Sequence, residues 1–217
     1  MTTLIFPHRT PFCWLNGPWV ARALDAFRAE LRIDVRHPPA TIETELDALH
    51  RRLHAPGDAL SGCALLPIAS PGLAFRHREA DGEHYVYVED LAHGRLAGYT
   101  VFNRLIEVDR RTDRHVRAPH SKYAAAYQGR GIATAVYEWG LGSGFCLISG
   151  ARQSEGAYAL WRALGRRHCL GFVAIRDKRM HYLGAEIEPA VREDLHTRMI
   201  LLGKGWSLRR LRAAGLL

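Results

Sequence analysis

The strongest constraint on this chain is a glycine-rich segment at 127–134, Tyr-Gln-Gly-Arg-Gly-Ile-Ala-Thr. Two glycines within three residues allow positive φ angles and let a ligand approach the backbone closely. An extended piece at about 114–126 precedes the glycines and a helix at about 131–142 follows them, which predicts a turn from a strand into a helix. The unpaired N–H groups and the positive dipole at the start of such a helix favour a bound pyrophosphate.

The rest of the chain divides by the period of its apolar residues and by its turn signals. The first third has the three- and four-residue spacing of amphipathic helices, and Pro38-Pro39 separates two of them. The middle third has strand patterns bounded by Pro-Gly, Asp-Gly and His-Gly pairs. The expected helices are 18–32, one that begins at Thr41, 154–164 and 188–202. The expected strands are the hairpin 83–90 and 96–102, the short strand 145–149, and a closing hairpin of 171–176 and 179–184.

Residues 128–133, Gln-Gly-Arg-Gly-Ile-Ala, fit the Gln/Arg-x-x-Gly-x-Gly/Ala signature of the GNAT superfamily of acyl-CoA-dependent N-acyltransferases. The helix at 154–164 resembles the second cofactor-lining helix of that family, through Ser154, Ala157, Trp161 and the pair Leu164-Gly165. The hairpin at 83–102 resembles the second and third strands of the family. The resemblance covers about residues 83–184, roughly half of the chain.

The resemblance implies an α/β (α+β) fold with a mixed, mostly antiparallel central sheet flanked by helices and a helical N-terminal segment. It divides the chain into an acceptor-side region at 1–75, an acyl-CoA-binding core at 76–185, and a C-terminal helix with a basic tail at 186–217. The strand before the turn, at 122–126, would diverge from its neighbour and offer its backbone to the pantetheine arm.

The resemblance also implies the chemistry, which is direct transfer of an acyl group, normally acetyl, from acyl-CoA to a primary amine of an unidentified small-molecule or protein acceptor. Acetyl-CoA or another acyl-CoA is the expected co-substrate. The positions expected to contact it are Tyr123, Ala124, Ala125, Gln128, Gly129, Arg130, Gly131, Ile132, Ala133, Thr134, Ser154 and Trp161.

Two residues depart from the family pattern. Ser154 stands where the family has asparagine, and Trp161 stands where a tyrosine often protonates the leaving thiolate; an indole N–H has no useful acidity. Tyr158, one turn earlier, is the candidate to replace that tyrosine. For the general base the candidates are Glu89 and His120, taken from a wider set on or near the adjacent strands: Glu89, Asp90, Glu107, His115 and His120.

His50 and His54 are four residues apart on an expected helix, a spacing that can place two imidazoles on one metal ion. The intervening Arg51-Arg52 and the lack of a third ligand in the sequence favour a solvated basic helix face instead. The sequence therefore predicts no metal.

The chain has a formal net charge of +8, which favours anionic partners but does not choose among them. Two alternatives stay open: an acyltransferase that uses a longer acyl chain or an acyl-carrier protein, and a non-catalytic module that binds nucleic acid, a less favoured partner, or a protein. No apolar run reaches the length of a membrane span, and the first residues lack the apolar stretch of a signal peptide, so we expect a cytoplasmic protein without a membrane partner. The closing hairpin and final helix are candidates for a homodimer face.

Overall fold

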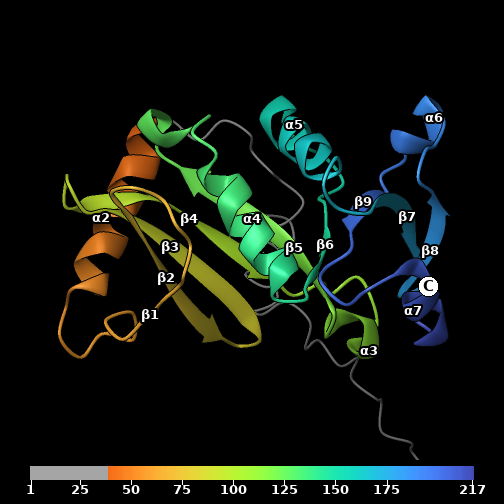
Figure 1. The fold of residues 1–217 in the computed structure, drawn as a ribbon, viewed down its shortest axis with the longest axis horizontal. Helices are drawn as coiled ribbons and strands as arrows, with labels where there is room; N and C mark the ends of the chain where they lie inside the picture. The colour runs from red at the N-terminus through yellow and green to blue at the C-terminus, as the bar shows by residue number, and fades with distance from the viewer. Residues whose placement is uncertain (1–38) are drawn as a thin grey trace, which may run out of the picture. The chain divides into compact units, whose positions relative to one another are not determined.

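The structure is a computed structural model, and it describes residues 39–217 (Figure 1). Contacts divide the chain into two units, 1–36 and 37–217, and the fold below is that of the second. The helix expected at 18–32 lies outside the described residues. None of the described helices is long and apolar enough to cross a membrane.

The described residues form a nine-stranded mixed sheet with the strand order β1-β2-β3-β4-β5-β6-β9-β7-β8. Adjacent strands are antiparallel except β5 and β6, which are parallel. The first half contains α2 (Pro39–Leu53), β1 (Ala64–Leu65), β2 (Leu73–Ala80), β3 (Glu83–Asp90), β4 (Arg95–Asn103), α3 (Arg110–Asp113), β5 (Val116–Tyr123) and the short 3₁₀ helix η1 (Ala125–Tyr127). The second half contains α4 (Ile132–Gly142), β6 (Cys146–Ile148), α5 (Glu155–Leu164), β7 (Leu170–Arg176), β8 (Arg179–Gly184), α6 (Pro189–Arg192), β9 (Thr197–Leu201) and α7 (Leu208–Ala213).

This arrangement confirms the expected fold class, a mostly antiparallel sheet flanked by helices. The elements expected from Thr41 onward at α2, at the β3–β4 hairpin, at α4 to α5 and at the β7–β8 hairpin all form within a few residues of their predicted bounds. The Asp81-Gly82 turn between β2 and β3 has positive φ angles at both residues, as a two-residue hairpin turn requires.

The C-terminal prediction is wrong. Instead of one amphipathic helix at 188–202, the chain forms the short α6 and then β9, which is buried along its whole length and lies between β6 and β7. The consecutive apolar residues 199–202 suit a strand that is covered on both faces. Residues 186–217 are therefore part of the core sheet, and the predicted boundary at 75/76 falls inside β2.

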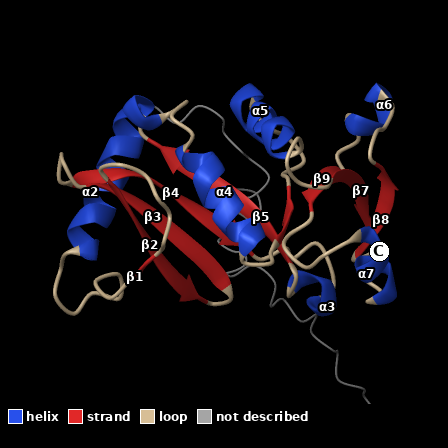
Figure 2. Ribbon diagram, in the orientation of Figure 1, coloured by secondary structure: helices blue, strands red, loops and turns tan. Residues whose placement is uncertain are grey.

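Two layers of helices cover the sheet. On one face α4 and α5 enclose a core with β3, β4, β6 and β9, and α4 crosses in front of the strands in Figure 2. On the other face α2 packs on β3 and β4, and α7 packs on the C-terminal strands. Because successive strand residues point to opposite faces, each strand of the middle of the sheet serves both layers.

Candidate functional site

The glycine-rich turn has the backbone conformation that its sequence predicts. Gly129 has φ of 70° and Gly131, the residue before α4, has φ of 76°, both in the left-handed region that favours glycine. A Cβ atom added to either glycine would meet no heavy atom within 4 Å. The residues of the turn from Gln128 to Gly131 are exposed, so a ligand can reach this backbone from solvent.

The start of α4 leaves its first amide groups unpaired within the helix. The first helical hydrogen bond runs from the N–H of Ala135 to the carbonyl of Gly131, over 3.0 Å. The N–H groups of residues 131–134 therefore have no intrahelical acceptor, as at any helix start. Together with the dipole of an 11-residue helix, they form a site of positive potential at the turn.

Two guanidinium groups add full charges beside the turn, and both contact Tyr127. The Cζ of Arg130 lies 5.4 Å from the centre of the Tyr127 ring, and the Cζ of Arg95 lies 5.8 Å from it. Arg95 Nε also donates to the Tyr127 hydroxyl over 3.3 Å. Arg95 comes from the start of β4, 32 residues before Tyr127, and no local sequence pattern indicates that it belongs to the site.

Asp90 holds the side chain of Tyr127 in place through a hydrogen bond. Its Oδ2 accepts a 2.7 Å hydrogen bond from the Tyr127 hydroxyl, and its Oδ1 accepts from the backbone N–H of Ala92 and His93. The Tyr127 hydroxyl first, and then His93, lower the pKa of Asp90 well below its usual range. The carboxylate therefore stays charged and holds the ring that both arginines contact.

The strands β5 and β6 diverge next to the turn. They pair only at Val116 with Cys146 and at Arg117 with Leu147, although β5 continues to Tyr123 (Figure 1). The N–H of Ala124 donates to Ala97 of β4, so by the alternation of a strand the backbone groups of Tyr123 and Ser121 face away from β4. Within residues 39–217, no strand pairs with β5 along this part of its outer edge.

The predicted strand at 122–126 is shorter than expected. It ends at Tyr123, and Ala125 belongs to the 3₁₀ helix η1, so the three alanines do not form a strand edge. A regular strand cannot continue here because the chain must bend into the turn. The carbonyl of Tyr123 accepts a 3.0 Å hydrogen bond from the side-chain amide of Gln128, which ties the end of β5 to the turn.

The predicted cofactor contacts on the two helices differ in their accessibility. At the start of α4, Ile132 is buried in the core and only its backbone faces the turn, whereas Ala133 and Thr134 are half-buried. Ser154 caps α5, because its Oγ accepts from the N–H of Ala157 over 3.2 Å. Trp161 is 3% exposed and its ring meets that of Tyr137 edge-on, which makes it a core residue rather than an open contact.

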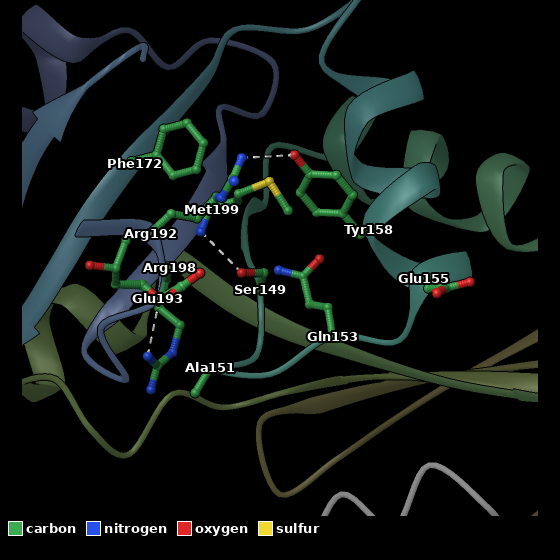
Figure 3. Close-up of a pocket in the computed structure, with 11 residues that line it drawn as sticks. Ser149, Ala151, Gln153, Glu155, Tyr158, Phe172, Arg192, Glu193, Arg198 and Met199 are labelled. Carbon is green, nitrogen blue, oxygen red and sulfur yellow. Dashed lines mark hydrogen bonds between the residues drawn. The ribbon is translucent and has the colours of Figure 1, made fainter. Parts of the chain in front are cut away.

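Tyr158, the predicted acid, lines a cavity of about 330 Å³ beyond the end of β6 (Figure 3). Its hydroxyl accepts a 3.4 Å hydrogen bond from Arg192 of α6, and Ser149 lines the same cavity, where its Oγ accepts from the N–H of Met199 over 3.0 Å. Tyr158 thus contacts α6, whereas Trp161 contacts α4. The role of Tyr158 as the acid toward the leaving thiolate stays a prediction.

The two predicted bases lie on the α2 face of the sheet. Glu89 is 4% exposed; burial raises its pKa, but hydrogen bonds from Arg76 and His54 outweigh this, and the net shift is downward. A carboxylate held in this way is a poor general base. His120 is exposed and lies opposite Val101 of β4, in the part of β5 that has diverged from β6.

Tyr123, a predicted cofactor contact, has a buried side chain whose hydroxyl lies 3.0 Å from Thr100 Oγ1.

No family model matches the sequence, and no curated protein matches it. Solved structures with a similar fold include a GNAT superfamily phosphinothricin acetyltransferase from Sinorhizobium meliloti in complex with acetyl-CoA, at 24% identity and a TM-score of 0.36, over 57% of this chain and 63% of that one. A ribosomal-protein-S5-alanine acetyltransferase from Vibrio fischeri matches at 16% identity and a TM-score of 0.32, over 58% and 64%. A cAMP-binding acyltransferase from Mycobacterium smegmatis matches at 14% and 0.39, over 79% and 62%.

The chain thus spans less than two thirds of each of these proteins. Because every identity is below 25% and every TM-score is below 0.5, the likeness concerns the fold alone and says nothing about substrate. The described residues form a mixed, mostly antiparallel sheet flanked by helices, with a strand, glycine turn and helix next to the point where two parallel strands diverge.

Proposed function

We propose that this chain is an acyl-CoA-dependent N-acyltransferase, which transfers an acyl group, with acetyl as the first donor to test, to a primary amine. The observation that carries the proposal is the exposed turn at the start of α4. This turn combines two glycines at positive φ with the unpaired amides of 131–134, and the guanidinium groups of Arg95 and Arg130 both contact Tyr127, which directly precedes it. A pyrophosphate is the ligand for which such a surface is suited.

The diverging strands support a path for the rest of the cofactor. From the turn, the pantetheine arm would run along the outer edge of β5, where the backbone groups of Ser121 and Tyr123 face away from β4. Amide groups of a strand edge can pair with the amides of pantetheine as another strand would. The acyl carbonyl would then lie between β5 and β6, and an N–H of the same edge could stabilise its oxyanion.

The transfer needs one nucleophile and two proton movements. The neutral amine attacks the thioester carbon, the tetrahedral intermediate collapses with cleavage of the C–S bond, and the products are an amide and the CoA thiol. A base removes one proton from the attacking nitrogen, and the departing sulfur takes up a proton. Of the two predicted bases His120 is the better suited, because an imidazole ordinarily titrates near neutrality and Glu89 is held by Arg76.

Thermal unfolding with acetyl-CoA tests the cofactor assignment. At a concentration of about 100 times Kd, a ligand that binds only the folded state adds about 2.7 kcal/mol of stability, which raises Tm by about 5–10 °C for a chain of this size. Arg130→Ala removes one exposed charge at the turn, and we expect about tenfold weaker binding, or about 1.4 kcal/mol. Arg209→Ala, which removes an exposed arginine from α7, is the matched control and should bind as the wild type does.

Release of free thiol from acetyl-CoA, measured over a panel of primary amines, tests the transfer itself. The protein could bind acetyl-CoA and yet transfer acetyl to no amine, while longer acyl-CoA donors or an acyl-carrier protein support transfer. That result would identify the longer acyl group, and not acetyl, as the one transferred. If acetyl-CoA and longer acyl-CoAs all leave Tm unchanged, the proposed function fails. Salt-dependent binding of nucleic acid in the same preparation would then favour the non-catalytic module.

A further inference from the structure

His50 of α2, His54 directly after the end of α2, and Glu89 of β3 have polar side-chain atoms close together on the α2 face of the sheet. His54 Nε2 lies 2.6 Å from Glu89 Oε1, and His50 Nδ1 lies 3.8 Å from the same oxygen. The two imidazole rings are 4.6 Å apart, centre to centre. All three ligand atoms lie within 4.8 Å of one another. The proposed acyl transfer uses neither of these histidines, and of the two predicted bases His120 is better suited to it than Glu89, which Arg76 holds.

The structure removes both sequence-based objections to metal binding by the histidine pair. Glu89 supplies the third ligand that the sequence does not reveal, from a strand 35 residues beyond His54. The intervening arginines are engaged elsewhere: Arg52 pairs with Asp58 over 3.0 Å, and Arg51 Nε donates to the carbonyl of Asp47 over 3.4 Å.

One nitrogen of the cluster is buried and unsatisfied. Nδ1 of His50 is shielded from solvent and has no hydrogen-bond partner within the described residues. A buried polar atom without a partner costs about 1–3 kcal/mol, so such atoms point to a missing ligand or ion. Nδ1 lies 3.8 Å from Glu89 Oε1, which is too far for a direct hydrogen bond.

We propose that His50, His54 and Glu89 form a binding site for a divalent transition metal ion, with Zn²⁺ as the best fit. Tetrahedral zinc with bonds of about 2.0–2.1 Å separates its ligand atoms by about 3.3 Å. The two separations from Glu89 Oε1, 2.6 Å and 3.8 Å, lie on either side of that value, and all three ligand atoms lie within 4.8 Å of one another, so rotation of the imidazoles would bring the three atoms around one ion. Two imidazoles and one carboxylate are a ligand set that zinc takes in proteins.

The surroundings of Glu89 suit a ligating carboxylate. Arg76 Nε donates to the other oxygen, Oε2, over 2.7 Å and fixes the plane of the carboxylate, while Oε1 is the oxygen that lies beside the two histidines. Hydrogen bonds of this kind orient metal ligands in many sites.

The fourth position would face solvent. The side chain of His54 is 49% exposed, whereas that of Glu89 is 5% exposed, so the cluster opens on the histidine side. Three protein ligands and an open position are the arrangement of zinc sites that keep a water molecule. Because the ligands come from the end of α2 and the end of β3, a bound ion would also fix α2 to the sheet.

Calorimetric titration of the full-length, tag-free protein with ZnCl₂, after removal of metal by a chelator, tests the site. We expect one equivalent of Zn²⁺ to bind to the wild type, and His54→Gln and His50→Gln each to weaken binding ~10-fold or more. His181→Gln, at an exposed histidine of β8, is the matched control and should leave binding unchanged. Circular dichroism would verify that each variant is folded. Because the side chain of His54 is 49% exposed, we expect His54→Gln to fold as the wild type does.

Two results would overturn the proposal. The first is wild-type binding no tighter than that of the double variant His50→Gln/His54→Gln. The second is binding that survives in this double variant and is lost in His8→Gln/His37→Gln, which would place the ion on residues outside 39–217. Co²⁺ in place of Zn²⁺ gives a visible absorption band that reports a nitrogen- and oxygen-ligated ion directly. No acyl-CoA is present in these measurements, so their outcome is independent of the proposed function.

Discussion

The most informative substitution in the proposed cofactor site is Gly131→Ala. At a φ of 76°, alanine is strained by about 1–2 kcal/mol relative to glycine, because its Cβ approaches the following carbonyl. The lower entropy of the unfolded alanine chain offsets about 0.4–1 kcal/mol of this. The net loss of stability is about 1 kcal/mol, which corresponds to a Tm about 2–4 °C lower.

The same methyl group has a second effect if the turn binds a pyrophosphate. It has no neighbour within 4 Å, and so it projects into the open space in front of the amides of α4, where the phosphate would lie. We expect a loss of at least tenfold in affinity for acetyl-CoA, or about 1.4 kcal/mol of the stabilisation by ligand. The ligand-induced rise in Tm would then be smaller by about 3–6 °C.

Gly72→Ala separates the two effects. Gly72 has φ of 74° and equally open surroundings, but it lies in the turn before β2. This variant should lose the same stability without ligand and keep the full shift with acetyl-CoA. Differential scanning fluorimetry over a series of acetyl-CoA concentrations measures both quantities. Equal ligand shifts in the two variants would refute the assignment of the turn as the phosphate site.

Two further predictions concern the fold itself. Leu211 is a fully buried residue of α7, and Leu211→Ala should lower the free energy of unfolding, measured by chemical denaturation, by about 2–5 kcal/mol. Leu195 is 53% exposed, and Leu195→Ala should change this free energy by no more than about 0.5 kcal/mol. Similar values for the two variants would mean that α7 is not packed on the core. Burial lowers the pKa of His77 and of His84, so the unfolded chain binds more protons than the folded one. The contribution of these two histidines to stability is therefore complete above about pH 6.5 and decreases as the pH falls below it. Between about pH 7.5 and 5.5, the Tm of the variant His77→Gln/His84→Gln should fall less than that of the wild type. An equal fall in Tm for the two proteins would contradict the role given to these histidines.

Local patterns were enough to predict the β3–β4 hairpin and the helices on either side of β6. The β3–β4 hairpin, α4 and α5 each have a periodic apolar pattern and clear turn or cap residues, such as Ser154 before α5. The C-terminal region lacked such a guide. Short apolar runs such as 199–202 fit a buried strand and a helix alike, and the insertion of β9 between β6 and β7 is set by long-range pairing that no local pattern encodes.

The candidate site was predictable only where it is contiguous. The backbone conformation of Gly129 and Gly131 follows from the sequence, since the same few residues make the turn and the helix start. The position of Arg95 does not follow, because it depends on how β4 pairs and on the contact with Tyr127. For the same reason Tyr158, correctly placed on α5, could not be assigned to a neighbour, and the structure places it against Arg192.

The end of β3 connects the two candidate sites. Glu89 and Asp90 are adjacent in the strand, so their side chains leave opposite faces of the sheet. Asp90 accepts a hydrogen bond from Tyr127, the residue that Arg95 and Arg130 contact, and Glu89 forms a hydrogen bond with His54 on the α2 face. In the sequence the two residues are an ordinary acidic pair before a surface turn. Both candidate sites therefore depend on the position of the same strand end.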